Sequence, residues 1–139
     1  MVDRDNLFAG RWELISELCQ YQEGAPPLHC TYEISVANEK ADFTLAWTDK
    51  DGKSHAMKYG GPTDGSVIPF KAGHVSEMSF SKADAHTLDS SSYSEGREVS
   101  YARRKASTDG ALLSVQMVTR HNGDSSTRNF QIFRRLNSA

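Results

Sequence analysis

The sequence predicts an all-β fold, a single antiparallel up-and-down β-barrel of about eight to ten strands. Three observations lead to this fold class. Turn-forming residue pairs recur along the whole chain, apolar and polar residues alternate between them, and a Gly-x-Trp near the start is matched by arginines near the end. We expect one domain that covers residues 1–139.

The turn pairs divide the chain into short, regular segments. Asp-Gly and Asn-Gly pairs favour tight hairpin turns, because type I′ turns need positive φ at both central residues. Successive pairs are 8 to 14 residues apart, which fits strands joined by hairpins. The pairs are Asp51-Gly52, Asp64-Gly65, Ala72-Gly73, Ala83-Asp84, Glu95-Gly96, Asp109-Gly110 and Asn122-Gly123.

Strands are predicted between these turns, with side chains that alternate between two faces. Tyr32, Ile34 and Val36 share one face of their strand, as Leu113 and Val115 do of theirs. An open meander of this length would leave two exposed edges, so closure into a barrel is favoured, and a β-sandwich is the alternative. The predicted strands are 11–21, 30–37, 42–48, 54–59, 66–70, 75–81, 87–93, 98–105, 111–120 and 127–136.

The first and last strands are expected to close the barrel. In this interpretation Gly10, Trp12 and Arg134 form its base, with the Arg134 cation against the Trp12 ring. Placing Trp12 opposite Arg134 puts Arg128 and Phe130 on the inner face. A two-residue turn at 122–123 also places Arg128 and Phe130 on the inner face. Apolar residues of the last strand then lie opposite apolar residues of both neighbouring strands.

Composition limits the possible partners. The net charge of −2 argues against nucleic acid, and no apolar run is long enough for a transmembrane helix. The first residues lack the apolar core of a signal peptide, so we expect a cytoplasmic protein, or a periplasmic or secreted one if a leader has been removed. Residues 97–139 carry 8 Lys or Arg against 3 acidic residues, which predicts a solvated basic face on the last strands.

Several short motifs resemble those of the calycin group, which includes lipocalins, fatty-acid-binding proteins and small bacterial lipocalin-like proteins. Gly10-Arg11-Trp12 resembles the Gly-x-Trp of the first lipocalin strand, and Arg134 or Arg135 resembles the arginine that packs on that tryptophan. The stretches 81–88 and 103–110 are similar to bacterial lipocalin-like sequences. The resemblance implies a barrel with a ligand cavity.

The resemblance also has limits. The stretch 126–130 is similar to the Arg-x-Tyr of fatty-acid-binding proteins, which grips a carboxylate, but Phe130 stands in the place of the tyrosine. The connection 22–29 contains Gly24, Pro26 and Pro27 and is too short for the two-helix lid of that family. Tyr101 and Arg103 share a face, and the length of the connection at 107–110 decides whether it is the inner one.

The chain therefore yields a set of candidate ligand-binding residues: Leu18, Tyr32, Trp47, Tyr101, Arg103, Met117, Arg128 and Phe130. The preferred function is binding of a small, largely apolar ligand, with or without an anionic head group, by a monomer or homodimer. A protein-interaction barrel with a filled interior is the alternative, and a small barrel enzyme is a third. Scattered histidines and the lack of a nucleophile motif predict no catalytic residue, metal or cofactor.

Overall fold

A computed structural model describes residues 3–121 and 125–136 of the chain. Eleven strands and one short 3₁₀ turn, η1 (Ser16–Leu18), follow one another in this part of the chain. The strands are β1 (Gly10–Leu14), β2 (Gln20–Tyr21), β3 (His29–Ala37), β4 (Lys40–Thr48), β5 (Ser54–Pro62), β6 (Asp64–Ala72), β7 (Val75–Asp84), β8 (Thr87–Ser94), β9 (Arg97–Ala106), β10 (Leu112–Arg120) and β11 (Ser126–Arg135). No helix within these described ranges has the length and apolar character needed to cross a membrane.

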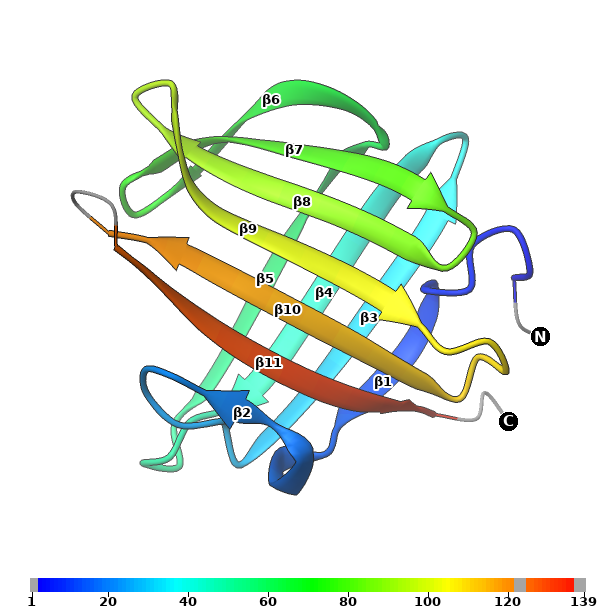
Figure 1. The fold of residues 1–139 in the computed structure, drawn as a ribbon, viewed down its shortest axis with the longest axis vertical. Coiled ribbons are helices and arrows are strands. Elements are labelled where there is room, and N and C mark those ends of the chain that lie inside the picture. The colour runs from blue at the N-terminus through cyan, green and yellow to red at the C-terminus, as the bar shows by residue number, and fades with distance from the viewer. Residues whose placement is uncertain (1–2, 122–124, 137–139) are drawn as a thin grey trace.

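The strands form one antiparallel sheet that curls into a nearly closed barrel (Figure 1). Their order is β5-β4-β3-β1-β11-β10-β9-β8-β7-β6, so strand β1 joins the two halves by pairing with both β3 and β11. The strands β5 and β6 lie at the two ends of this order and are not paired with each other. The predicted fold class, an all-β up-and-down barrel rather than a sandwich, is confirmed.

The first predicted strand, 11–21, is wrong in one respect, because it breaks in two. The chain leaves β1 at Ile15, passes through η1 and resumes as β2, which pairs with β11. This break ends the alternation on which Leu18 was placed inside, and Leu18 is 51% exposed. The connection from η1 to β3 carries no α-helix among its described residues, as the shortness of 22–29 predicted.

The barrel is sealed at its base by Arg135 rather than by Arg134. Trp12 faces Arg135 across the β1–β11 ladder, one residue away from the predicted register. The Arg135 guanidinium lies 4.2 Å from the centre of the Trp12 ring and donates to the carbonyl oxygens of Leu7 (2.6 Å), Ala9 (2.8 Å) and Gly110 (2.7 Å). The neighbouring Arg134 points outward and pairs with Glu13.

Gly10 is required beside this arginine. Its φ of +138° is rarely adopted by other residues, and a Cβ atom there would lie 2.3 Å from Arg135 Nη1. Gly10 and Trp12 thus lie beside Arg135 at this end of the barrel, and the arginine that packs on Trp12 is Arg135 instead of the predicted Arg134.

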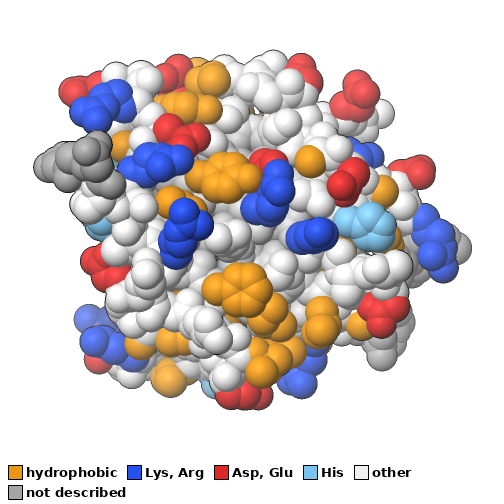
Figure 2. Space-filling model, viewed as in Figure 1, with side chains coloured by type: hydrophobic (Ala, Val, Ile, Leu, Met, Phe, Trp, Pro, Cys, Tyr) orange, Lys and Arg blue, Asp and Glu red, His pale blue; other side chains and the backbone are white. Residues whose placement is uncertain are grey.

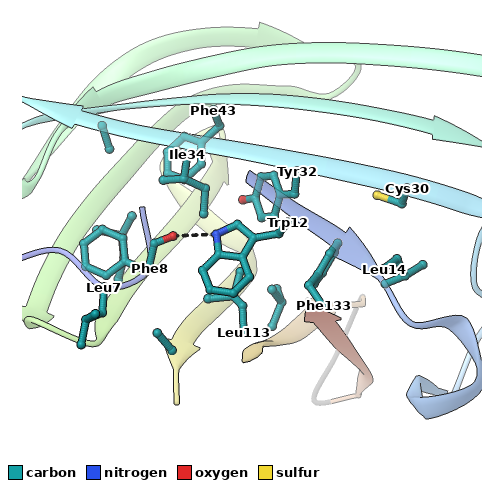
Figure 3. Packing of buried hydrophobic residues seen from close by; sticks show 14 of the residues in the cluster. Leu7, Phe8, Trp12, Leu14, Cys30, Tyr32, Ile34, Phe43, Leu113 and Phe133 are labelled. Carbon is teal, nitrogen blue, oxygen red and sulfur yellow. Dashed lines mark hydrogen bonds between the residues drawn. The ribbon is translucent and has the colours of Figure 1, made fainter. Parts of the chain in front are cut away.

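Large apolar side chains fill the interior next to this base. Trp12 is fully buried and donates its indole N–H to the Phe8 carbonyl at 3.0 Å (Figure 3). Phe43 and Phe80 stack with ring centroids 5.2 Å apart. The largest fully buried side chains are Trp12, Phe8, Phe43, Phe80, Phe133, Ile34, Leu88 and Leu113.

Because Trp12 faces Arg135 instead of Arg134, the side chains of β11 point to the faces opposite to those predicted. Leu113 faces Phe133 across the β10–β11 ladder, and both are buried. Because side chains alternate with a period of two, Arg128 and Phe130 point outward instead of inward. The expected two-residue turn at 122–123 lies outside the described residues.

Most basic residues of the last strands lie on the outer face of the barrel, and Arg104 and Arg135 are the exceptions. Figure 2 shows Lys and Arg side chains spread across the face formed by the later strands, with acidic side chains among them. Three exposed ion pairs hold this pattern: Arg103–Asp89, Arg120–Glu98 and Arg134–Glu13. This arrangement fits the predicted solvated basic face.

Candidate functional site

The barrel encloses a cavity beyond its filled base. The first lobe of this cavity has a volume of about 430 Å³, within the range typical of ligand pockets. Its walls are mostly apolar and aromatic. They include Cys30, Tyr32, Leu45, Trp47, Tyr59, Ala102, Val115, Met117 and Phe133.

The first lobe opens between two connections. Gly24, Ala25 and Pro27 come from the loop before β3, and Asp49 and Lys50 come from the turn between β4 and β5. The second connection brings one cation, Lys50, and one carboxylate, Asp49, to the edge of the lobe. The Asp49 carboxylate is paired with His55 at 2.8 Å, which lowers the pKa of Asp49.

A second lobe of about 330 Å³ continues the cavity toward β6 and β7. The two lobes share five lining residues: Leu45, Tyr59, Ala102, Arg104 and Met117. The shared residues make the two lobes neighbouring parts of one interior space, with Arg104 at their junction.

Arg104 is the most distinctive side chain of this interior. It lies on β9 and is only 4% exposed. Its Nε donates to Tyr32 Oη at 2.5 Å, its Nη1 to Ser90 Oγ at 2.9 Å and its Nη2 to Tyr59 Oη at 3.5 Å. The guanidinium also lies 4.8 Å from the centre of the Phe43 ring. Three of its five N–H groups therefore have protein acceptors, and two are left.

The charge of Arg104 has no carboxylate partner in the described part of the chain. Among residues 3–121 and 125–136, no Asp or Glu lies within ion-pair distance of it. Burial raises the pKa of Tyr32 well above its usual value, so its phenol stays neutral. A desolvated cation with only neutral partners is costly, and an anion that reached it would be bound strongly.

The structure distributes the predicted ligand-binding residues between the interior and the surface. Tyr32, Trp47 and Met117 line the first lobe, and Tyr101 borders the second. In contrast, Leu18, Arg103, Arg128 and Phe130 line neither lobe. Arg128 and Phe130 border a separate surface hollow beside β2.

Alternation along β9 explains why Arg104 was missed. Ala106 on β9 pairs with Leu113 on β10, so six residues connect the paired positions. Because this number is even, Arg103 points outward and Arg104 inward. The outward Arg103 pairs with Asp89 at 2.8 Å. The Arg-Arg-Lys run at 103–105 was the available signal, because two adjacent arginines in a barrel strand cannot both face the solvent.

Neither thiol nor metal chemistry is indicated by the geometry. Cys19 and Cys30 are both free, and burial raises the pKa of the Cys30 thiol to about 12, which keeps it protonated and unreactive. Within the described part of the chain, no group of three or more His, Cys, Asp or Glu side chains is placed to hold a metal ion.

Comparisons of the fold place this architecture among known barrels. The chain is similar to a mutant of the fluorescent protein UnaG, with a TM-score of 0.64 and 14% identity over 95% of this chain and 98% of that one. The fold is that of the calycins. A zebrafish ileal bile acid-binding protein, solved with cholic acid, gives a TM-score of 0.57 and 14% identity over 94% of this chain and 100% of that one.

A third calycin shows that the similarity extends to lipocalin-type structures. The siderocalin Ex-FABP gives a TM-score of 0.51 and 11% identity over 94% of this chain and 71% of that one. By sequence, no protein-family model matches the chain, and a search of curated proteins finds no significant match. At these identities the calycin similarity establishes the fold alone.

Proposed function

We propose that this protein binds a small, largely apolar ligand with an anionic head group inside the barrel, and that Arg104 holds the head group. The observation that carries the proposal is the Arg104 guanidinium itself. It is buried, lines both lobes, has two N–H groups to spare and has no carboxylate partner among the described residues.

The remaining lining supports an apolar body for the ligand. Burial of an alkyl group contributes about 0.8 kcal/mol per CH₂, and Met117 with the aromatic side chains offers an adaptable apolar wall. The structural neighbours include a bile acid-binding protein solved with cholic acid. The filled-interior alternative fits less well, because the first lobe alone measures about 430 Å³.

The test compares a long-chain fatty acid with the alcohol of the same length. Arg104→Gln should weaken binding of the acid about 10- to 100-fold, the value of a lost charge-assisted hydrogen bond, and weaken the alcohol much less. Arg103→Gln is the matched control, because it removes the same charge one residue away on the outer face. Isothermal titration calorimetry measures both ligands. Equal losses for acid and alcohol would contradict the proposal.

A further inference from the structure

The second lobe has one apolar wall and one wall that carries hydroxyl groups. Leu45, Met57, Phe70, Val75 and Met78 from β4 to β7 form the apolar side. The other side, from β8 to β10, combines hydroxyl groups with Ala102, Met117 and Val118. The hydroxyl groups belong to Ser90, Ser92, Ser100 and Thr119. A cavity meant only for an alkyl chain would not need this row of hydroxyls.

The serine hydroxyls retain unused hydrogen-bond donors. Ser90 Oγ accepts from Arg104, and no acceptor for its own O–H is found in the described residues. Ser92 Oγ and Ser100 Oγ bond to each other, which uses one O–H of the two and leaves the other free. Ser90 and Ser92 are 6% and 7% exposed, and buried donors without acceptors are unfavourable. An oxygen atom on a ligand would satisfy them.

The strand register places these groups in a line that begins at Arg104. On β9, Arg104, Ala102 and Ser100 face the interior in succession, and they pair with Leu88, Ser90 and Ser92 on β8. Residues two apart on a strand are about 7 Å apart. The Ser92–Ser100 pair therefore lies one such step beyond Ser90, the serine that Arg104 contacts.

We propose that Ser92 and Ser100 form a specificity site for a second polar group on the ligand, a hydroxyl or carbonyl oxygen that lies one strand step, about 7 Å, beyond Ser90. The inference rests on the proposed function, in which Arg104 holds that head. The ligand class becomes an oxygenated apolar acid, with its oxygen on the serine wall and its hydrocarbon against Met57, Phe70 and Met78.

The experiment uses octadecanoic acid, a series of its hydroxylated positional isomers, and octadecanol. For the wild type, an isomer whose hydroxyl reaches the serine pair should bind about 3- to 10-fold more tightly than the plain acid, the value of one neutral hydrogen bond. Isomers with the hydroxyl elsewhere should bind no better than the plain acid.

Variants then assign this preference to the serines. Ser92→Ala with Ser100→Ala should abolish the preference, so that the hydroxy acid binds no more tightly than the plain acid. Ser114→Ala is the control, since Ser114 lies on β10 outside both lobes. Ser100→Thr keeps a hydroxyl and should keep the preference, which guards against a folding defect in the alanine variants.

Three outcomes separate this inference from the function on which it rests. If all isomers bind equally, or if the alanine variant loses the plain acid and the hydroxy acid alike, the serine site is wrong. If the serine site is wrong but the wild type still binds octadecanoic acid more tightly than octadecanol, Arg104 remains the proposed anchor of the head group. If acid and alcohol bind equally to the wild type, the proposed function itself is wrong.

Discussion

Arg135 and Arg104 have different kinds of partners in this barrel. Arg135 is surrounded by three backbone carbonyl oxygens and the Trp12 ring, so its partners are fixed parts of the chain. Arg104 has three side-chain hydroxyl partners and borders open space in both lobes. The first arrangement closes a fold, and the second leaves capacity for a ligand.

Adjacent arginines allow the structural role of Arg135 to be measured. Arg135→Ala should destabilise the protein by about 2–4 kcal/mol, because charge-assisted bonds to carbonyls and the contact with Trp12 are lost together. Arg134→Ala should cost less than about 1 kcal/mol, as expected for an exposed ion pair with Glu13. Urea unfolding followed by tryptophan fluorescence gives both values. Equal losses in the two variants would refute the assignment of the base to Arg135.

At the scale of elements, the sequence predicted most of the strands but not the face to which every side chain points. Turn pairs such as Asp51-Gly52 and Glu95-Gly96 are local signals, and strands lie on both sides of each. The face of a strand depends on register, and a one-residue error turns every side chain over. Choosing Arg134 instead of Arg135 to face Trp12 was such an error, and it placed Arg128 on the wrong side.

The candidate site was predictable only in part for the same reason. Tyr32, Trp47 and Met117 were placed in the cavity because their strands have clear alternation. The face to which Arg104 points depends on the length of the connection between β9 and β10, and the residue types at 107–110 do not determine that length. The chain leaves the ladder of β1 at Ile15, and no Gly, Pro or turn-forming pair marks this break in the sequence.

The turn between β4 and β5 carries a prediction about ligand entry. Lys50 lines the mouth of the first lobe, so Lys50→Glu should slow the association of an anionic ligand several-fold at low ionic strength, with little difference at high salt. Lys58→Glu is the control, because it makes the same charge change on β5 away from both lobes. Stopped-flow fluorescence measures the rates. An identical slowing by both variants would mean that the mouth has no special role.

The whole molecule should lose stability in alkaline solution. Burial raises the pKa of Cys19, Cys30, Tyr21 and Tyr32, with that of Cys30 at about 12. In the unfolded chain thiols ionise near 8.5 and phenols near 10, so above about pH 9 the unfolded state binds fewer protons than the folded one. Stability is therefore full below that pH and declines as the pH rises toward 12.

Urea midpoints measured from pH 7 to pH 11 test this expectation. The midpoint should fall across the upper part of that range, and Cys30→Ala should make the fall shallower, because it removes one of the four groups. A midpoint that stays constant up to pH 11 would contradict the inferred burial of these thiols and phenols.

Burying the Arg104 cation should lower the stability of the ligand-free protein and strengthen the binding of an anionic ligand. Arg104→Met removes the buried charge and keeps a flexible side chain in the same space, and Tyr32 and Tyr59 still bond to each other at 2.9 Å. We expect the ligand-free variant to unfold at the same temperature as the wild type or a higher one.

A bound ligand stabilises a protein by about 2.7 kcal/mol at a concentration of 100 Kd. A fatty acid at 100 times the wild-type Kd should therefore raise the midpoint of the wild type by several degrees and raise that of Arg104→Met by clearly less. Differential scanning calorimetry with and without the acid measures both effects. A variant that is less stable when free and stabilised by the acid as much as the wild type would show that Arg104 supports the fold and not the ligand.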